Sequence, residues 1–171
     1  MTRLTYTEQR GVIGVTTLNN KIYVVYHKIE LPLIVVYMSE QPYTRLPNIS
    51  INGLKGPWGI AASSSCLYVS DKGSSAIWRV KTANSKVDQW LSGLLAASVS
   101  VTSEEKLVLM VAVDGQGSLK ERNTNYRGEI QIYNAGAVKE TVIKLSPDIT
   151  SPHCRHDNEE DIYCQLWLPM A

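Results

Sequence analysis

The sequence predicts an all-β protein, a partial β-propeller with about three complete four-stranded blades and an interrupted fourth. The first observation is an internal repeat, because the segment 14–25 aligns without a gap with the segment 59–70. Each segment reads as a short apolar strand, a polar turn and a second strand with an aliphatic-Tyr-Val core. Repeats of about 40 to 50 residues built from short strands are typical of propeller blades, whose faces are covered by neighbouring blades.

Chain length is the second observation. Propellers of four to eight blades need roughly 160 to 360 residues, so the 171 residues here hold three blades and part of a fourth. We expect residues 1–10 to be the end of a preceding blade or a linker, and residues 11–152 to form the partial propeller. The expected blades are about 11–53, 54–95 and 96–147, followed by a divergent C-terminal tail at 153–171.

In the first blade, Asn19-Asn20 marks a tight hairpin, because asparagine tolerates the positive φ that such turns require. Pro47 indicates that the segment around it is the outermost strand of the blade, since proline has no backbone N–H to donate to a neighbouring strand. The expected strands are 11–18, 21–27, 33–38 and 43–51.

In the second and third blades, Trp78 and Trp90 are expected in the core. The polar excursion 114–128 is long for a hairpin loop and is either a binding loop or disordered. A fourth blade begins at Ser151-Pro152-His153, but the charged run 155–161 interrupts it. The expected strands are 58–62, 66–70, 76–81 and 87–92, then 98–102, 106–113, 129–133 and 138–145.

Composition limits the classes of function. Seventeen basic and sixteen acidic residues leave almost no net charge, which argues against a dedicated nucleic-acid binder. The longest apolar run, 31–38, is far shorter than the roughly 20 residues of a membrane span, so no membrane insertion is expected. The three cysteines favour reduced thiols and a cytoplasmic protein, the alternative being a Cys154–Cys164 disulfide.

The second blade carries a family resemblance. Gly56-Pro57-Trp58-Gly59-Ile60-Ala61, then Leu67-Tyr68-Val69-Ser70-Asp71, then Ala76-Ile77-Trp78-Arg79-Val80 resemble an NHL-type propeller repeat. They are also similar to the YWTD repeats of low-density-lipoprotein-receptor propellers. The resemblance covers residues 11–152, but Tyr26 occupies the position of Asp71 in the first blade and Asp114 comes late in the third. It implies a non-enzymatic scaffold that binds protein or RNA on one propeller face.

Two alternatives remain open. A lactonase-like hydrolase would hold a divalent metal in the central channel, yet the expected inner strands carry no carboxylate. An extracellular receptor or adhesion module would bring a signal peptide and paired cysteines. No cofactor and no metal are expected. Asp71 is interpreted as a turn residue that accepts backbone hydrogen bonds. An accidental grouping in the tail, rather than zinc ligation, is favoured for the set His153, Cys154, His156 and Cys164.

The expected contact face is built from the loops between blades and between second and third strands. Its basic and aromatic residues suit an acidic protein segment or, as the alternative, single-stranded RNA. Trp58 in this set is interpreted first as an inter-blade packing residue and second as a stacking platform. Self-association through open blade faces is also expected. The candidate residues are Lys55, Trp58, His27, Lys28, Lys72, Lys120, Arg122 and Arg127.

Overall fold

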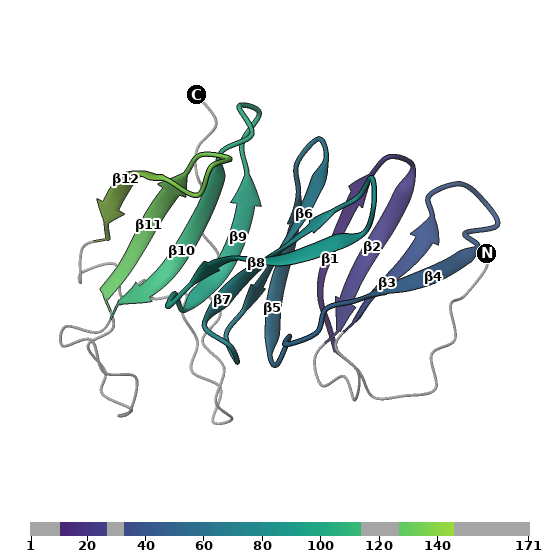
Figure 1. The fold of residues 1–171 in the computed structure, drawn as a ribbon, viewed down its shortest axis with the longest axis horizontal. Coiled ribbons are helices and arrows are strands. Elements are labelled where there is room, and N and C mark those ends of the chain that lie inside the picture. Colours follow the sequence, from purple (N-terminus) through teal and green to yellow (C-terminus); the bar gives the residue numbers. More distant parts are fainter. Residues whose placement is uncertain (1–10, 27–32, 114–126, 146–171) are drawn as a thin grey trace, which may run out of the picture.

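The computed structural model describes residues 11–26, 33–113 and 127–145. These ranges contain twelve β-strands and no helix, which confirms the all-β prediction (Figure 1). No helix long and apolar enough to cross a membrane is therefore found in the described ranges. The expected end of a preceding blade, the interrupted fourth blade and the divergent tail lie outside the described residues.

The strands form three separate four-stranded antiparallel sheets, each in sequential order. The first blade contains β1 (Val12–Leu18), β2 (Lys21–Tyr26), β3 (Leu33–Met38) and β4 (Arg45–Ser50). The second contains β5 (Pro57–Ala62), β6 (Cys66–Asp71), β7 (Ala76–Lys81) and β8 (Lys86–Ser92). The third contains β9 (Ala96–Val101), β10 (Leu107–Val113), β11 (Arg127–Tyr133) and β12 (Lys139–Lys144).

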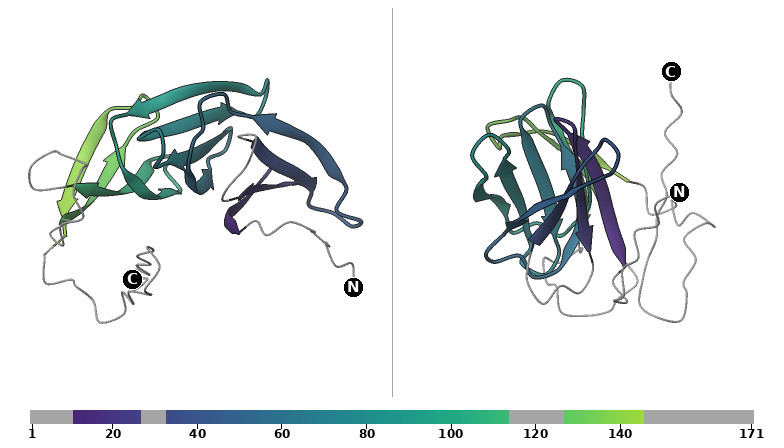
Figure 2. Two further views of the ribbon diagram at one scale, coloured as in Figure 1. Left: turned by 90° about the horizontal axis from the view of Figure 1, so that it is seen from below. Right: turned by 90° about the vertical axis from the view of Figure 1, so that its right-hand side faces the viewer.

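The three blades stand side by side in a curved array (Figure 2). Their inner strands β1, β5 and β9 are neighbours on the concave side, and the outer strands β4, β8 and β12 lie toward the convex side. This is the arrangement of successive propeller blades, in which each blade buries its faces against the next.

Two apolar clusters fill the spaces between blades. The cluster between the first and second blades includes Val25, Ile34 and Leu67, and Trp78 packs against it. Trp90 lies in the cluster between the second and third blades, where Tyr68 and Tyr133 approach it edge-on. The expected core positions of Trp78 and Trp90 are therefore confirmed.

Turn chemistry explains where the strands of the first blade end. Asn19 and Asn20 both have positive φ, as predicted for the β1–β2 hairpin. Pro47 lies in β4, which pairs only with β3 in the described sheet. The predicted outer strand, 43–51, is longer than the observed one. Tyr43 has a positive φ in the preceding turn, and pairing with β3 begins at Arg45.

In the third blade the inner strand begins at Ala96, two residues before the expected start. Ala96 pairs with Val111, and Ser98 pairs with Met110, so Ala97 is the extra residue of a β-bulge. A bulge breaks the strict alternation on which the sequence prediction relied.

Candidate partner-binding site

The site is organised by Asp71, the last residue of β6. Its side chain is fully buried and its carboxylate accepts hydrogen bonds from two separate loops. The amides of Lys55 and Gly56, in the connection from the first to the second blade, donate at 2.9 and 2.7 Å. The amides of Gly73 and Ser74, in the β6–β7 turn, donate at 3.0 and 3.3 Å. The predicted turn role of Asp71 is therefore confirmed, and it extends to a second loop.

Two side chains complete the set of donors around Asp71. The Ser74 hydroxyl donates to Oδ2, and the Trp78 indole Nε1–H donates to the same oxygen at 3.2 Å. Burial alone raises the pKa of the Asp71 carboxyl, but the hydrogen bonds it accepts, above all from Ser74, lower the pKa below its ordinary value. The buried carboxylate is thus ionised, and both of its oxygens accept hydrogen bonds.

The two loops also touch directly. The Lys72 amide donates to the Gly56 carbonyl at 2.9 Å. A Cβ placed on Gly73 would lie 2.7 Å from the Gly56 nitrogen and 2.8 Å from the Lys55 Cβ. Only glycine at position 73 allows this approach, so the relative position of the two loops is fixed by the sequence.

Lys55, Trp58 and Lys72, here called the rim cluster, are carried by these loops and by the start of β5. The side chains of Lys55 and Lys72 are exposed, and Trp58 is half-buried. The Lys72 ammonium lies 4.9 Å from the centre of the Trp58 ring, in cation–π contact. Trp58 is itself the extra residue of a β-bulge, because Pro57 pairs with Asp71 and Gly59 with Ser70. Bulges redirect side chains next to binding sites.

The structure thus brings together three of the eight candidate residues. His27, Lys28, Lys120 and Arg122 lie outside the described residues. Arg127 begins β11, and only its backbone is described. The second strands of the other two blades, β2 and β10, end at Tyr26 and Val113. These ends lie on the same rim as the end of β6, since each precedes the connection to the third strand of its blade.

Sequence reasoning missed the side-chain partners of Asp71. The sequence predicts the core position of Trp78 but not the hydrogen bond from its indole to Asp71, and it predicts no contact between Ser74 and Asp71. The segment Asp71-Lys72-Gly73-Ser74 did carry a signal, because an aspartate followed by glycine and serine is typical of a turn in which the carboxylate binds several amides.

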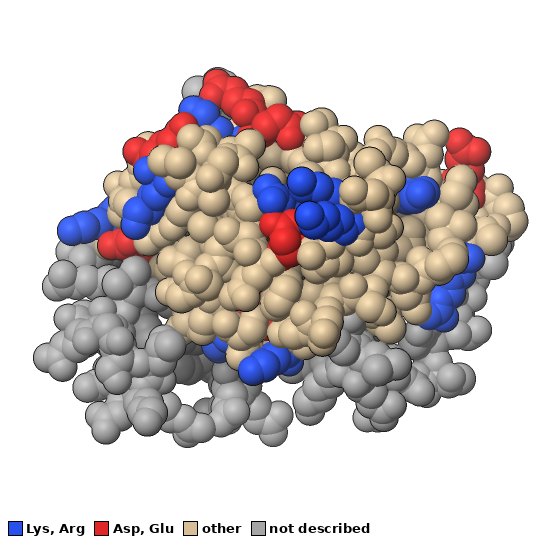
Figure 3. All heavy atoms as spheres, in the orientation of Figure 1, with Lys and Arg blue, Asp and Glu red and all other residues tan. Residues whose placement is uncertain are grey.

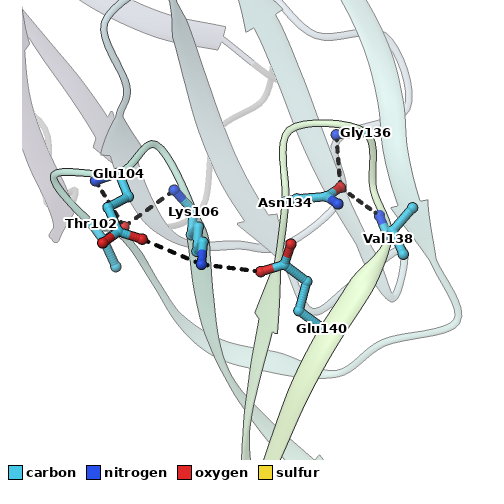
Figure 4. A network of polar contacts seen from close by, with 7 residues as sticks. All are labelled: Thr102, Glu104, Lys106, Asn134, Gly136, Val138 and Glu140. Carbon is cyan, nitrogen blue, oxygen red and sulfur yellow. Dashed lines mark hydrogen bonds and ion pairs between the residues drawn. The ribbon is translucent and has the colours of Figure 1, made fainter.

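Ion pairs hold some of the charged side chains elsewhere on the described surface. Arg79 and Asp88 form an ion pair at 2.7 Å, between β7 and β8. Lys106 lies 3.3 Å from both Glu104 and Glu140, beside the turns capped by Thr102 and Asn134 (Figure 4). On the face shown in Figure 3, basic and acidic groups are interspersed among uncharged residues. Among the described residues, no carboxylate forms an ion pair with Lys55 or Lys72.

The described residues contain no group of three or more His, Cys, Asp and Glu side chains placed to hold a metal ion. The set His153, Cys154, His156 and Cys164 lies outside them. Cys66, in β6, has a free thiol.

The fold of this chain is similar to that of known protein structures. No protein-family model matches the sequence, and no curated protein matches it. A chain in a crystal structure of a nidogen/laminin complex is similar with a TM-score of 0.56 and 14% identity, covering 75% of this chain and 46% of that chain. Hydrazine synthase from Kuenenia stuttgartiensis is similar with a TM-score of 0.57 and 12% identity, covering 84% of this chain and 38% of that chain.

Both of these structures are β-propellers, and the chain described here has the same fold. It spans less than half the length of either structure. The narrower NHL-type assignment has no matching family model and stays a prediction.

Proposed function

We propose that this chain is a non-enzymatic interaction module that binds an acidic segment of a partner protein at the rim cluster of Lys55, Trp58 and Lys72. The observation that carries the proposal is the buried Asp71 carboxylate, which holds both loops by their backbone amides. The two lysine side chains are left exposed on a fixed support. A site of this kind binds without first having to order its loops.

The chemistry of the rim cluster favours carboxylates as ligands. Two exposed ammonium groups offer charge-assisted hydrogen bonds, which are shorter and stronger than neutral ones. The NHL-type resemblance supports a scaffold role, because it implies partner binding on a propeller face. The nidogen/laminin complex supports a protein partner by analogy of fold, which is a weaker argument than the site itself.

The cation–π contact favours a protein segment over single-stranded RNA. A base that stacked on Trp58 would compete with Lys72 for the ring face, 4.9 Å away. An acidic peptide requires no such exchange, because the carboxylates approach the ammonium groups from solvent. RNA is therefore the competing outcome of the test.

The test compares two labelled probes on the whole chain, a fluorescein-labelled decaglutamate peptide and a labelled decauridine RNA, by fluorescence anisotropy at 50 mM and 200 mM salt. We expect the peptide to bind and to weaken as salt rises, because ion pairs between exposed groups are screened. Binding of the RNA alone would contradict the assigned class of partner. Absence of binding by both probes would contradict the proposal as a whole.

A further inference from the structure

The face of the third blade that points away from the second blade is apolar. Met110 of β10 pairs with Ile130 of β11, which pairs with Ile143 of β12. Val108 and Ile132 form a second row beside them. Ile143 is 48% exposed, and the other four are half-buried. Among the described residues, none of these five belongs to an apolar cluster shared with another blade, and together they are here called the open face.

The equivalent face of the second blade shows what covers such a surface. Its Tyr68 corresponds to Val108 and is 6% exposed. Its Ile77 corresponds to Ile130 and is fully buried. Both lie in one apolar cluster with Leu109 from the second strand of the next blade, and the inner strand of that blade, β9, also contacts β6. A face of this type is thus covered by the first two strands of the blade that follows.

The sequence after β12 repeats the pattern of these two strands. Residues 152–166 align without a gap with residues 57–71, which contain β5 and β6. The proline at the first position and the tyrosine at the twelfth are identical in the two segments. The connection from the preceding blade also fits, because six residues (51–56) lead from β4 to the one segment and seven (145–151) lead from β12 to the other.

The second strand of this segment has the alternation that the contact between blades requires. In β6, Leu67 and Val69 lie in the cluster with the preceding blade and are 0% exposed. Ile162 and Cys164 occupy the same two positions, and Leu166 continues the series. A reduced cysteine packs as a small apolar residue. The segment therefore offers an apolar stripe that suits the open face.

The charged run 155–161 is compatible with this alignment. Its acidic part, 157–161, falls on the end of β5 and on the turn that leads into β6. The third blade itself carries Glu104 and Glu105 in the corresponding turn, and both are exposed. Glu105 accepts hydrogen bonds from the Ser64 amide of the second blade at 3.0 and 3.1 Å. An acidic turn between the first two strands is therefore already part of this array.

Arg155 has a matching residue on the inner strand of the third blade. Between the first two blades, a Cβ on Gly14 would lie 3.0 Å from Cγ2 of Ile60. Arg155 takes the position of Ile60, and Ser98 takes that of Gly14. Ser98 is exposed, and a serine hydroxyl accepts hydrogen bonds from a guanidinium. The glycine–aliphatic contact of the first interface is thus replaced by a serine–arginine pair.

We propose that residues 152–166 form the inner hairpin of a fourth blade and pack on the open face of the third blade in the same chain. The segment lies outside the described residues, so the proposal rests on its sequence and on the described face that receives it. Ile162 and Cys164 contact the open face, and Arg155 lies beside Ser98. The proposal goes beyond partner binding at the rim cluster and does not depend on it.

The same chain is favoured as the source of this hairpin. A segment joined through the short connection 145–151 is present at an effective concentration of roughly millimolar or more. A segment from a second copy has the same sequence but loses translational and rotational freedom when it binds. A repeat array also needs its end faces covered, and this hairpin covers one of them.

The first test measures how fast N-ethylmaleimide labels Cys164 in the whole chain, by mass spectrometry of its peptides. Cys164 takes the position of Val69, which is 0% exposed. We expect labelling at least about tenfold slower than in the urea-unfolded chain, because the thiol reacts only when the hairpin opens. Glu159→Cys, in the turn, is the exposed control and should react at nearly the unfolded rate. Equal protection factors at positions 159 and 164 would overturn the proposal.

Two neighbouring residues of β12 identify the face that is covered. Ile143 pairs with Ile130 on the open face, whereas Val142 pairs with the buried Gln131 on the side of the second blade. They are 48% and 40% exposed, so the described blades should tolerate aspartate at either position. Ile143→Asp should speed the labelling of Cys164 several-fold, and Val142→Asp should leave it unchanged. The same effect from both variants, or from neither, would show that the segment does not lie on the open face.

A disulfide tests the alignment and the source of the segment. In a chain whose native cysteines are replaced by alanine, Ser98→Cys with Arg155→Cys should form a link within one chain on mild oxidation. The corresponding residues 14 and 60 are in contact, and the Cβ atoms of a disulfide lie about 3.5–4.5 Å apart. Ser98→Cys with Glu159→Cys is the control and should form none. A link between two chains would assign the hairpin to a second copy, and no link at all would overturn the alignment.

Discussion

The Gly56 amide donates a 2.7 Å hydrogen bond to Asp71, fifteen residues further along the chain, and so ties the connection between two blades to a hairpin turn. The same carboxylate binds the amides of that turn and the indole of Trp78. One buried charge therefore fixes the backbone from which Lys55 and Lys72 extend.

Asp71→Ala should destabilise the protein severely. The substitution leaves buried amides and the Trp78 indole without their acceptor, and the loss of one partner from such a network costs about 3 kcal/mol or more. Chemical denaturation followed by tryptophan fluorescence measures the change. Asp88→Ala is the control, because the Arg79–Asp88 pair is partly exposed and should contribute roughly 1 kcal/mol or less. Equal losses in the two variants would show that Asp71 is an ordinary surface-type carboxylate.

The stability that Asp71 provides should depend on pH in one direction. Its pKa is lowered in the folded state, so the folded protein binds fewer protons than the unfolded chain. The contribution is complete above the unfolded pKa of about 3.9 and is lost as pH falls through that value toward the folded pKa. The difference in unfolding free energy between wild type and Asp71→Asn should therefore shrink between pH 6 and pH 3. A constant difference would contradict the assignment.

Gly14→Ala should destabilise the protein although alanine is a small residue. The new Cβ would lie 3.0 to 3.1 Å from Ile60, so the first and second blades must move apart slightly. Overpacking of this kind costs about 1 to 3 kcal/mol. Gly11→Ala is the matched control, because a Cβ there meets no atom within 4 Å. Thermal unfolding should show a lower midpoint for position 14 only, and an unchanged midpoint there would mean that the inner strands are not in close contact.

Charge reversal in the third blade tests the RNA alternative. If the chain binds single-stranded RNA, the logarithm of affinity falls linearly with the logarithm of salt concentration, by about 0.7 per phosphate neutralised. Arg122→Glu with Arg127→Glu should then weaken binding and flatten that slope. An acidic peptide bound at the rim cluster should be affected much less. A loss of peptide affinity equal to that of Lys55→Glu with Lys72→Glu would place the contact face on the third blade instead.

The order and approximate extent of the strands followed from local sequence, apart from the bounds of the outer strand of the first blade and the inner strand of the third. Alternating apolar residues, the Asn19-Asn20 hairpin and Pro47 in the outer strand each depend on neighbouring residues only, and each prediction agrees with the structure. The register also confirms that Tyr26 occupies the position of Asp71, since Tyr26 pairs with Val12 as Asp71 pairs with Pro57.

What the sequence did not reveal depends on contacts between distant segments. The bulge at Ala97 shifts β9, and it places Val111 rather than an acidic residue at the position of Asp71 in the third blade. The contact of Lys72 with Trp58 depends on the approach of Gly73 to Gly56. Lys55, Trp58 and Lys72 lie on one rim of the second blade, and their role in partner binding stays a prediction.

Charge reversal at the rim cluster tests the central claim most directly. Anisotropy titrations with labelled decaglutamate compare wild type with Lys55→Glu/Lys72→Glu, and with the control Lys81→Glu/Lys86→Glu. The control pair is also exposed, and it flanks the turn at the opposite end of the second blade. We predict that reversal at the rim weakens binding at least about tenfold, or about 1.4 kcal/mol, while the control changes it by less than about twofold. Equal weakening by both pairs would contradict the account, because net charge alone would then explain the binding.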